Sequence, residues 1–272
     1  MRDLYTTTFL CLIILMTGCG ESEQQHRAVG DDYQLNKILH GGWLPLDFVR
    51  DLPSNKSPYN LRNELATVSE ILFDSADIKG EKVEARGGWG NFEGFNANFY
   101  VYRDENGHVV LNDKKLGMHI NLKSVGPDYI LEISDGTFTT SLKKVMSPKA
   151  YKSASRKNDL SMVNYYIIRN LLQGKYKSEQ DSAVFIMEDG SIEGLDGYTD
   201  FSLNTSFLSG DAIHGDVLTM IGDSKEENYL YQFDGNTLVL KEIELENGDG
   251  EGGTKFKETG KTITLKRDVP TD

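Results

Sequence analysis

Cysteine is almost absent from this chain, with only Cys11 and Cys19 among 272 residues. Both lie near the N-terminus, Cys11 within the apolar run Phe9–Met16 and Cys19 three residues after that run ends. If residues 1–18 are removed and Cys19 is modified, the mature chain has no free thiol. Disulfides, zinc–cysteine sites and cysteine nucleophiles are then excluded.

Long apolar runs are also missing. The run Phe9–Met16 is too short to cross a bilayer, which takes about 20 apolar residues. It suits the core of a secretion signal, which is about 7–15 residues long and ends in small residues such as Thr17 and Gly18. We therefore predict a signal peptide over residues 1–18. The alternatives to a signal that ends in a modified Cys19 are an ordinary secretory signal cut near Gly18 and an uncleaved anchor.

The residues around Cys19 resemble the lipobox of bacterial lipoproteins, although Met16 stands where that motif usually has Leu. The resemblance implies that the thiol of Cys19 is acylated and becomes the mature N-terminus, so that the protein is attached to a membrane of the cell envelope. In enterobacterial lipoproteins an Asp directly after the acylated cysteine favours retention in the inner membrane. This chain has Gly20 at that position, so the resemblance implies the outer membrane. Glu21 and Glu23 loosely resemble the export signal of surface lipoproteins in the Bacteroides group, and leave open whether the protein faces the periplasm or the cell surface.

Positive charge is scarce in the second half of the chain. Between Gly20 and Ile168 there are 18 basic and 20 acidic residues, a net charge of −2, whereas the chain from Arg169 onward has 10 basic and 21 acidic residues, −11. Such a surface repels phosphate backbones, so no nucleic acid is expected as a partner. The acidic excess is typical of a protein that needs solubility.

The chain contains an internal repeat. Tyr33–Trp43 aligns with Tyr166–Tyr176 at an offset of 133, and a second block aligns at an offset of 109, in which Trp89 matches Tyr198. Repeats of this kind indicate duplicated structural units, and chance similarity between β-rich segments is the alternative. We predict a polar tether over residues 19–32, units over 33–147 and 160–267, and a linker over 148–159. The first unit has an insertion near residues 51–65.

Each unit has the pattern of short strands separated by turns. In the first unit we predict strands at Trp43–Val49, Ser69–Asp74, Lys82–Arg86, Asn96–Arg103, His108–Asn112, Met118–Lys123, Tyr129–Ile133 and Phe138–Val145. Eight short antiparallel strands favour a closed barrel, which has no exposed sheet edge. The predicted fold is therefore all-β, with two tandem eight-stranded antiparallel barrels, each preceded by a short helix, and a further helix near Tyr59–Ala66.

The start of each unit resembles the lipocalins. Gly41-Gly42-Trp43 is a Gly-x-Trp at the beginning of a strand that follows a short helix, and Gly174-Lys175-Tyr176 is its counterpart. In lipocalins this tryptophan plugs the closed end of the barrel beneath a basic residue of the last strand. The resemblance implies that Lys143 or Lys144 has this role in the first unit, and Lys266 or Arg267 in the second.

Four aromatic residues near glycines are candidate ligand contacts: Trp89, Phe99, Tyr198 and Phe207. Aromatic side chains at a barrel rim can stack on a sugar or an apolar ligand, and the alternative is that they fill the barrel cores. We expect a lipid-anchored envelope protein that binds a small apolar or glycan-like ligand. The alternative is a protein-interaction, inhibitor or immunity-type lipoprotein with filled barrels.

No catalytic or metal-binding pattern stands out. The five histidines lack paired ligand spacing, and the chain has no Gly-x-Ser-x-Gly elbow. Residues 247–258 partly match a calcium-loop template but lack flanking helices, so we interpret Asn247–Gly253 as a flexible acidic hairpin loop. We expect no enzymatic activity, no cofactor and no bound metal.

Overall fold

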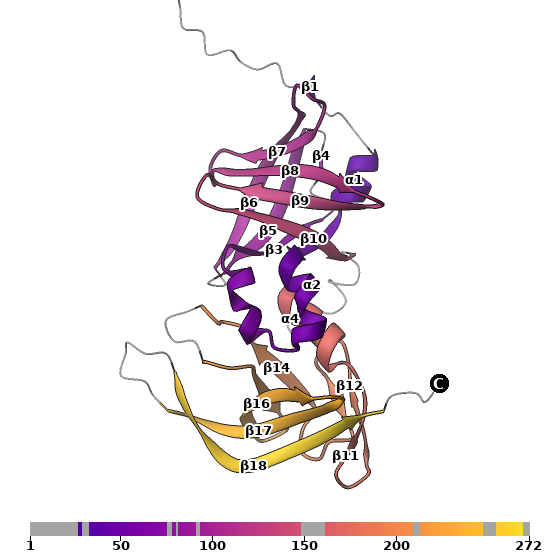
Figure 1. The fold of residues 1–272 in the computed structure, drawn as a ribbon, viewed down its shortest axis with the longest axis vertical. Coiled ribbons are helices and arrows are strands. Elements are labelled where there is room, and N and C mark those ends of the chain that lie inside the picture. The colour runs from indigo at the N-terminus through magenta and orange to yellow at the C-terminus, as the bar shows by residue number, and fades with distance from the viewer. Residues whose placement is uncertain are drawn as a thin grey trace, which may run out of the picture.

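The computed structural model describes residues 27–28, 33–74, 78–79, 81–90, 93–147, 161–208, 213–246 and 254–268. The signal peptide, Cys19, most of the tether, the linker 148–159 and the loop Asn247–Gly253 lie outside these residues. The described chain is mostly β-strand, in two antiparallel sheets with helices between them (Figure 1).

The first sheet contains a closed eight-stranded barrel. Its strands are β2 (Gly41–Pro45), β3 (Val68–Phe73), β5 (Lys82–Trp89), β6 (Gly94–Arg103), β7 (Val109–Asp113), β8 (Met118–Val125), β9 (Asp128–Ser134) and β10 (Thr139–Met146). Each pairs with the next, and β10 pairs back with β2, which closes the ring. Two short strands are added outside it, β1 (Arg27–Ala28) on β6 and β4 (Ile78–Lys79) on β5. Arg27 and Ala28 of the predicted tether thus belong to the sheet.

The second sheet repeats this order and is nearly closed. Its strands are β11 (Gly174–Ser178), β12 (Ala183–Ile186), β13 (Ile192–Glu193), β14 (Asp200–Asn204), β15 (Val217–Ile221), β16 (Glu226–Asp234), β17 (Thr237–Glu246) and β18 (Lys255–Arg267). The last strand, β18, pairs back with β11. Between β13 and β14 the ring is joined by the isolated bridge Ser191–Asp200. Two eight-stranded antiparallel barrels are therefore present, as predicted.

A helix precedes each barrel. Helix α1 (Tyr33–Leu39) leads into β2, and α4 (Met162–Ile167), continued by the π-helical turn η3 (Ile168–Leu172), leads into β11. The insertion of the first unit forms α2 (Leu46–Asn55) and the 3-10 helix η1 (Tyr59–Leu65). The prediction of a strand over Trp43–Val49 is wrong beyond Pro45. The chain enters a helix at Leu46, since Phe48 and Leu52, four residues apart, are both buried on one side of α2.

One hydrophobic cluster is shared between the outside of barrel 1 and the interior of barrel 2, while the interior of barrel 1 forms a second cluster. Strand β2 is buried along its whole length because Trp43 faces the inside of barrel 1, whereas Leu44 belongs to the outer cluster with Phe48 and Met162. The same cluster continues into the interior of barrel 2. Helices α2 and α4 lie between the barrels in Figure 1. The amphipathic helix that opens the second unit thus covers the outside of barrel 1.

Hydrogen bonds also cross this interface. The carboxylate of Glu70 on β3 accepts the N–H of Val163 at 3.1 Å, at the first turn of α4. Burial raises the pKa of the Glu70 carboxyl above its ordinary value, and the hydrogen bond from Val163 offsets part of that rise. The N–H of Tyr59 donates to Asp216 at 2.7 Å, and the Lys56 ammonium donates to the carbonyl of Gly235 at 2.8 Å. The helical insertion and helix α4 therefore both link the two units.

Candidate functional site

An aromatic residue anchors the start of each barrel. The indole N–H of Trp43 donates to the carbonyl of Leu39 at 2.9 Å, and the hydroxyl of Tyr176 donates to that of Leu172 at 2.6 Å. Both side chains are fully buried. Each member of the second pair lies 133 residues after its counterpart, so the repeat extends to individual contacts.

A cation from the last strand lies over each anchor. The Lys144 ammonium is 5.9 Å from the Trp43 ring centre, and the Arg267 guanidinium is 5.2 Å from that of Tyr176. Both cations also donate to carbonyls at the end of the preceding helix: Lys144 to Lys37 and Ile38, and Arg267 to Leu171 and Gln173. Of the candidates for this position, Lys144 and Arg267 therefore occupy it. They fix the helix end against the barrel.

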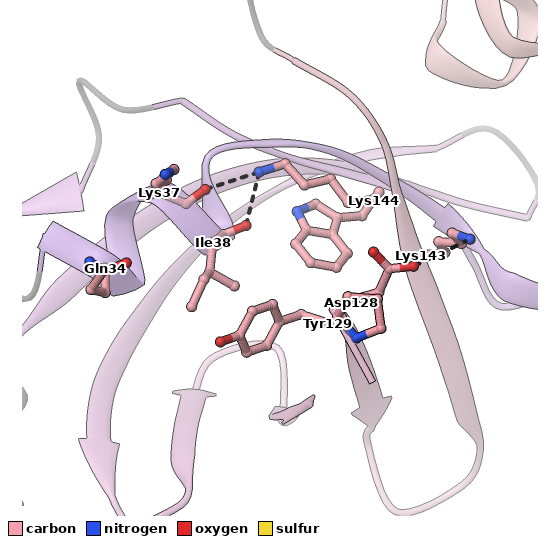
Figure 2. Close-up of a pocket in the computed structure, with 9 residues that line it drawn as sticks. Gln34, Lys37, Ile38, Asp128, Tyr129, Lys143 and Lys144 are labelled. Carbon is pink, nitrogen blue, oxygen red and sulfur yellow. Dashed lines mark hydrogen bonds and ion pairs between the residues drawn. The ribbon is translucent and has the colours of Figure 1, made fainter. Parts of the chain in front are cut away.

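An open pocket of about 340 Å³ lies beside the anchor of barrel 1 (Figure 2). Its lining residues are Gln34, Lys37, Ile38, Trp43, Pro127, Asp128, Tyr129, Lys143 and Lys144. Three lysines and one aspartate line it, and the Lys143 ammonium is 3.9 Å from the Asp128 carboxylate. Burial lowers the pKa of Lys144. The pocket lies at the end of barrel 1 beside α1, and three of its lining residues are basic on an acidic protein.

A second polar site closes the far end of barrel 2. The Tyr198 hydroxyl bonds to the Glu227 carboxylate and lies 2.7 Å from the Tyr229 hydroxyl. The Lys261 ammonium donates to Glu227 at 2.8 Å and to Glu242 at 3.0 Å. The hydrogen bonds from Lys261 and then Tyr198 lower the pKa of Glu227 to about 2, and the same carboxylates raise the pKa of Lys261. The Lys225 ammonium lies 3.4 Å from Glu227, so two cations balance two carboxylates and the network is an internally neutralised plug.

The loops around this plug are acidic. Five exposed carboxylates lie at this end of barrel 2, four in loops between strands and Glu226 at the start of β16: Glu179, Asp181, Asp196, Asp223 and Glu226. Two of them, Glu179 and Asp196, line an open pocket of about 280 Å³ with Tyr198, Lys225 and Lys261. We call the five residues the acidic rim. It concentrates part of the negative charge of the second unit on one surface.

The four predicted ligand contacts are not brought together. Phe99 lies inside barrel 1, 6.2 Å from Phe73, and is fully buried. Trp89 is half-buried at the end of that barrel opposite Trp43, and the centre of its ring lies 4.8 Å from that of Phe95. Phe207 packs on Tyr59 at the interface between the units, at 5.8 Å.

Tyr198, the fourth predicted contact, belongs to the plug, whose other members the sequence analysis missed. Glu227 was detectable, because it lies two residues before the buried Tyr229 and so on the inward face of β16, where a carboxylate is unusual.

Buried side chains occupy the described interior of each barrel. The one enclosed cavity described within barrel 2 has a volume of about 10 Å³ and an entirely apolar lining that includes Leu172, Phe201 and Leu265. Inside barrel 1 the inward residues of β6, including Phe95, Phe99 and Val101, are buried in a continuous cluster. A small-molecule pocket usually measures about 300–1,000 Å³. The interiors thus resemble packed cores.

Among the residues that the structure describes, no group of three or more His, Cys, Asp and Glu side chains is placed to hold a metal ion. Within the same residues, no helix has the length and apolarity needed to span a bilayer. Comparison with protein-family models, with curated proteins and with solved structures yields no match.

Proposed function

We propose that this chain is a lipid-anchored protein of the cell envelope that acts by binding a protein partner, with two filled lipocalin-like barrels as its scaffold. The anchor is Cys19, and the outer membrane is the proposed location. The lipocalin relationship is supported by the eight-stranded up-and-down order of each barrel, the helix before it, and the anchors Trp43 and Tyr176 beneath Lys144 and Arg267.

The packed interiors favour binding of a protein partner over binding of a small ligand inside the barrels. A ligand inside barrel 2 would have to displace core residues, because the enclosed cavity there is about 10 Å³, roughly the space that a single water needs. A binding function inside the barrels is therefore disfavoured, and the outer surface is the better candidate for the contact.

The acidic rim is the surface that we assign to the partner. Lys261 is paired with Glu227 and Glu242 within the plug, and Lys177 pairs with Asp181 at 3.3 Å, so the five carboxylates of the rim keep an excess of negative charge that faces solvent. A ring of like charges steers a partner of opposite charge and selects against others. The partner is accordingly expected to present a basic surface.

Co-purification from the native envelope tests this proposal. The double variant Glu179→Lys/Asp196→Lys reverses two exposed charges of the rim, and Glu84→Lys/Glu93→Lys reverses two exposed charges on barrel 1 as the matched control. We expect a protein that copurifies in stoichiometric amount with the wild type and the control and is lost from the rim variant. A partner that remains with the rim variant would contradict the assignment.

A further inference from the structure

The β8–β9 hairpin of barrel 1 exposes apolar side chains beside a basic pocket. Val125 and Tyr129 flank its Gly126-Pro127 turn and are 54% and 38% exposed, which makes them two of the few large hydrophobic residues on the described surface. Pro127 and Tyr129 also line the pocket of about 340 Å³ that holds Lys37, Lys143 and Lys144. Figure 2 shows Tyr129 and Ile38 facing one space, with the Lys144 ammonium above it and Lys37 and Lys143 at its opposite edges.

This hairpin lies at the end of barrel 1 where the chain enters. In an up-and-down barrel alternate strands run the same way, so the last residues of β6, β8 and β10 share one end with the start of β2. Strand β1 pairs there with Tyr102 and Arg103 of β6, and α1 lines the pocket itself. The N-terminal chain and the hairpin are therefore on the same side of barrel 1.

The proposed anchor brings this end to a membrane. Cys19 precedes Arg27 by eight residues, and a fully extended chain covers at most about 3.6 Å per residue, or about 29 Å in all. An acylated Cys19 thus keeps Arg27, which lies at the same end of barrel 1 as the hairpin, within about 29 Å of the membrane.

We propose that Lys37, Val125, Pro127, Tyr129 and Lys143, which we call the membrane-facing patch, bind the headgroup layer of an anionic phospholipid membrane. This inference rests on the proposed anchor at Cys19. In this proposal Lys37 and Lys143, at opposite edges of the pocket, contact headgroup phosphates, and the three apolar or aromatic residues reach the boundary with the acyl chains. Aromatic and basic residues favour this interfacial region.

The distribution of charge also supports an orientation in which the membrane-facing patch points towards the membrane. Lys144 is occupied by the carbonyls of α1, and Asp128 is paired with Lys143 only at 3.9 Å, so that ammonium remains available to a stronger anion. The chain as a whole carries a net charge of −13. An anionic membrane therefore repels most of the protein and attracts this patch, which holds the acidic rim of barrel 2 in solution.

Site-directed spin labelling of the lipidated full-length protein tests the patch. Because the mature chain has no other free thiol once Cys19 is acylated, Val125→Cys gives one label on the hairpin, and Ser182→Cys gives a control label on the exposed β11–β12 turn. The protein is reconstituted in vesicles of phosphatidylcholine alone or with one quarter phosphatidylglycerol. Collision of each label with oxygen and with a water-soluble nickel chelate is then measured.

We expect the label at residue 125 to be several-fold less accessible to the chelate than the label at 182, and more so in the anionic vesicles. The variant Lys37→Glu/Lys143→Glu should lose this protection, whereas Lys175→Glu/Lys177→Glu on barrel 2 should keep it.

Equal chelate access at residues 125 and 182, in protein that floats with the vesicles, would overturn the patch and leave the anchor standing. Failure to float would overturn the anchor, and the patch with it. Binding of soluble glycerol phosphate, measured by calorimetry, with an unprotected label at 125 would replace the membrane assignment by a small-anion site.

Discussion

Removing Phe48 should separate the unfolding of the two barrels. Phe48 is fully buried in the core cluster that joins the units, and its ring lies 6.5 Å from that of Tyr166. Truncation of a buried Phe to Ala costs about 3–5 kcal/mol, as the lost burial is added to the cavity left behind. Typical domains are stable by only about 5–15 kcal/mol, so Phe48→Ala should remove much of the coupling.

The chain offers a convenient assay for this separation. Both tryptophans, Trp43 and Trp89, belong to the first unit, so tryptophan fluorescence reports barrel 1 alone, while far-ultraviolet circular dichroism reports both barrels. In urea, the two signals of the wild type should change together. In Phe48→Ala they should change at different urea concentrations.

Phe99→Ala is the matched control. Phe99 is equally buried and loses the same atoms, but it lies inside barrel 1 rather than between the units. It should destabilise barrel 1 by a similar amount and shift the fluorescence transition. If Phe48→Ala left both transitions coincident and cost less than about 1 kcal/mol, far below the range for a buried Phe, the shared core would be refuted.

Three further predictions concern single groups. Tyr176→Phe should lower the free energy of unfolding by about 1–3 kcal/mol, measured by urea denaturation, because the carbonyl of Leu172 and the guanidinium of Arg267 each lose a buried partner; an unchanged midpoint would contradict this. Since the pKa of Glu227 is lowered to about 2 in the folded protein, its contribution is present above about pH 4.5 and is lost as the pH falls towards 2. Glu227→Gln should therefore be less stable than the wild type at neutral pH, and the gap in thermal midpoint should close on acidification; a constant gap would count against the network. Cys19→Ser should abolish incorporation of labelled palmitate, and equal labelling of both forms would exclude the anchor.

Most of the fold follows from local patterns in the sequence. In seven of the eight strands of barrel 1, both ends lie within three residues of the predicted ones, because each strand is bounded by turn residues and alternates inward and outward positions. The eighth prediction failed at Leu46. A short apolar run is compatible with either a strand or a buried helix. In this segment the burial of Phe48 and Leu52 against the second unit favours the helix.

The candidate sites were harder to predict than the fold. Aromatic residues near glycines are common to barrel rims and barrel cores, so the pattern at Phe99 and Phe207 does not distinguish a ligand contact from packing. The plug around Glu227 and Lys261 joins residues 34 positions apart. Such contacts depend on strand register, which a single sequence does not supply.

Native mass spectrometry of the mature protein purified from its host tests the central claim, that filled barrels support a protein contact. We expect the spectrum to show the mass of the acylated chain, alone or with a stoichiometric protein partner, and no small molecule held in the barrels. A small molecule bound in equal amount, whose removal lowers the thermal midpoint, would contradict it.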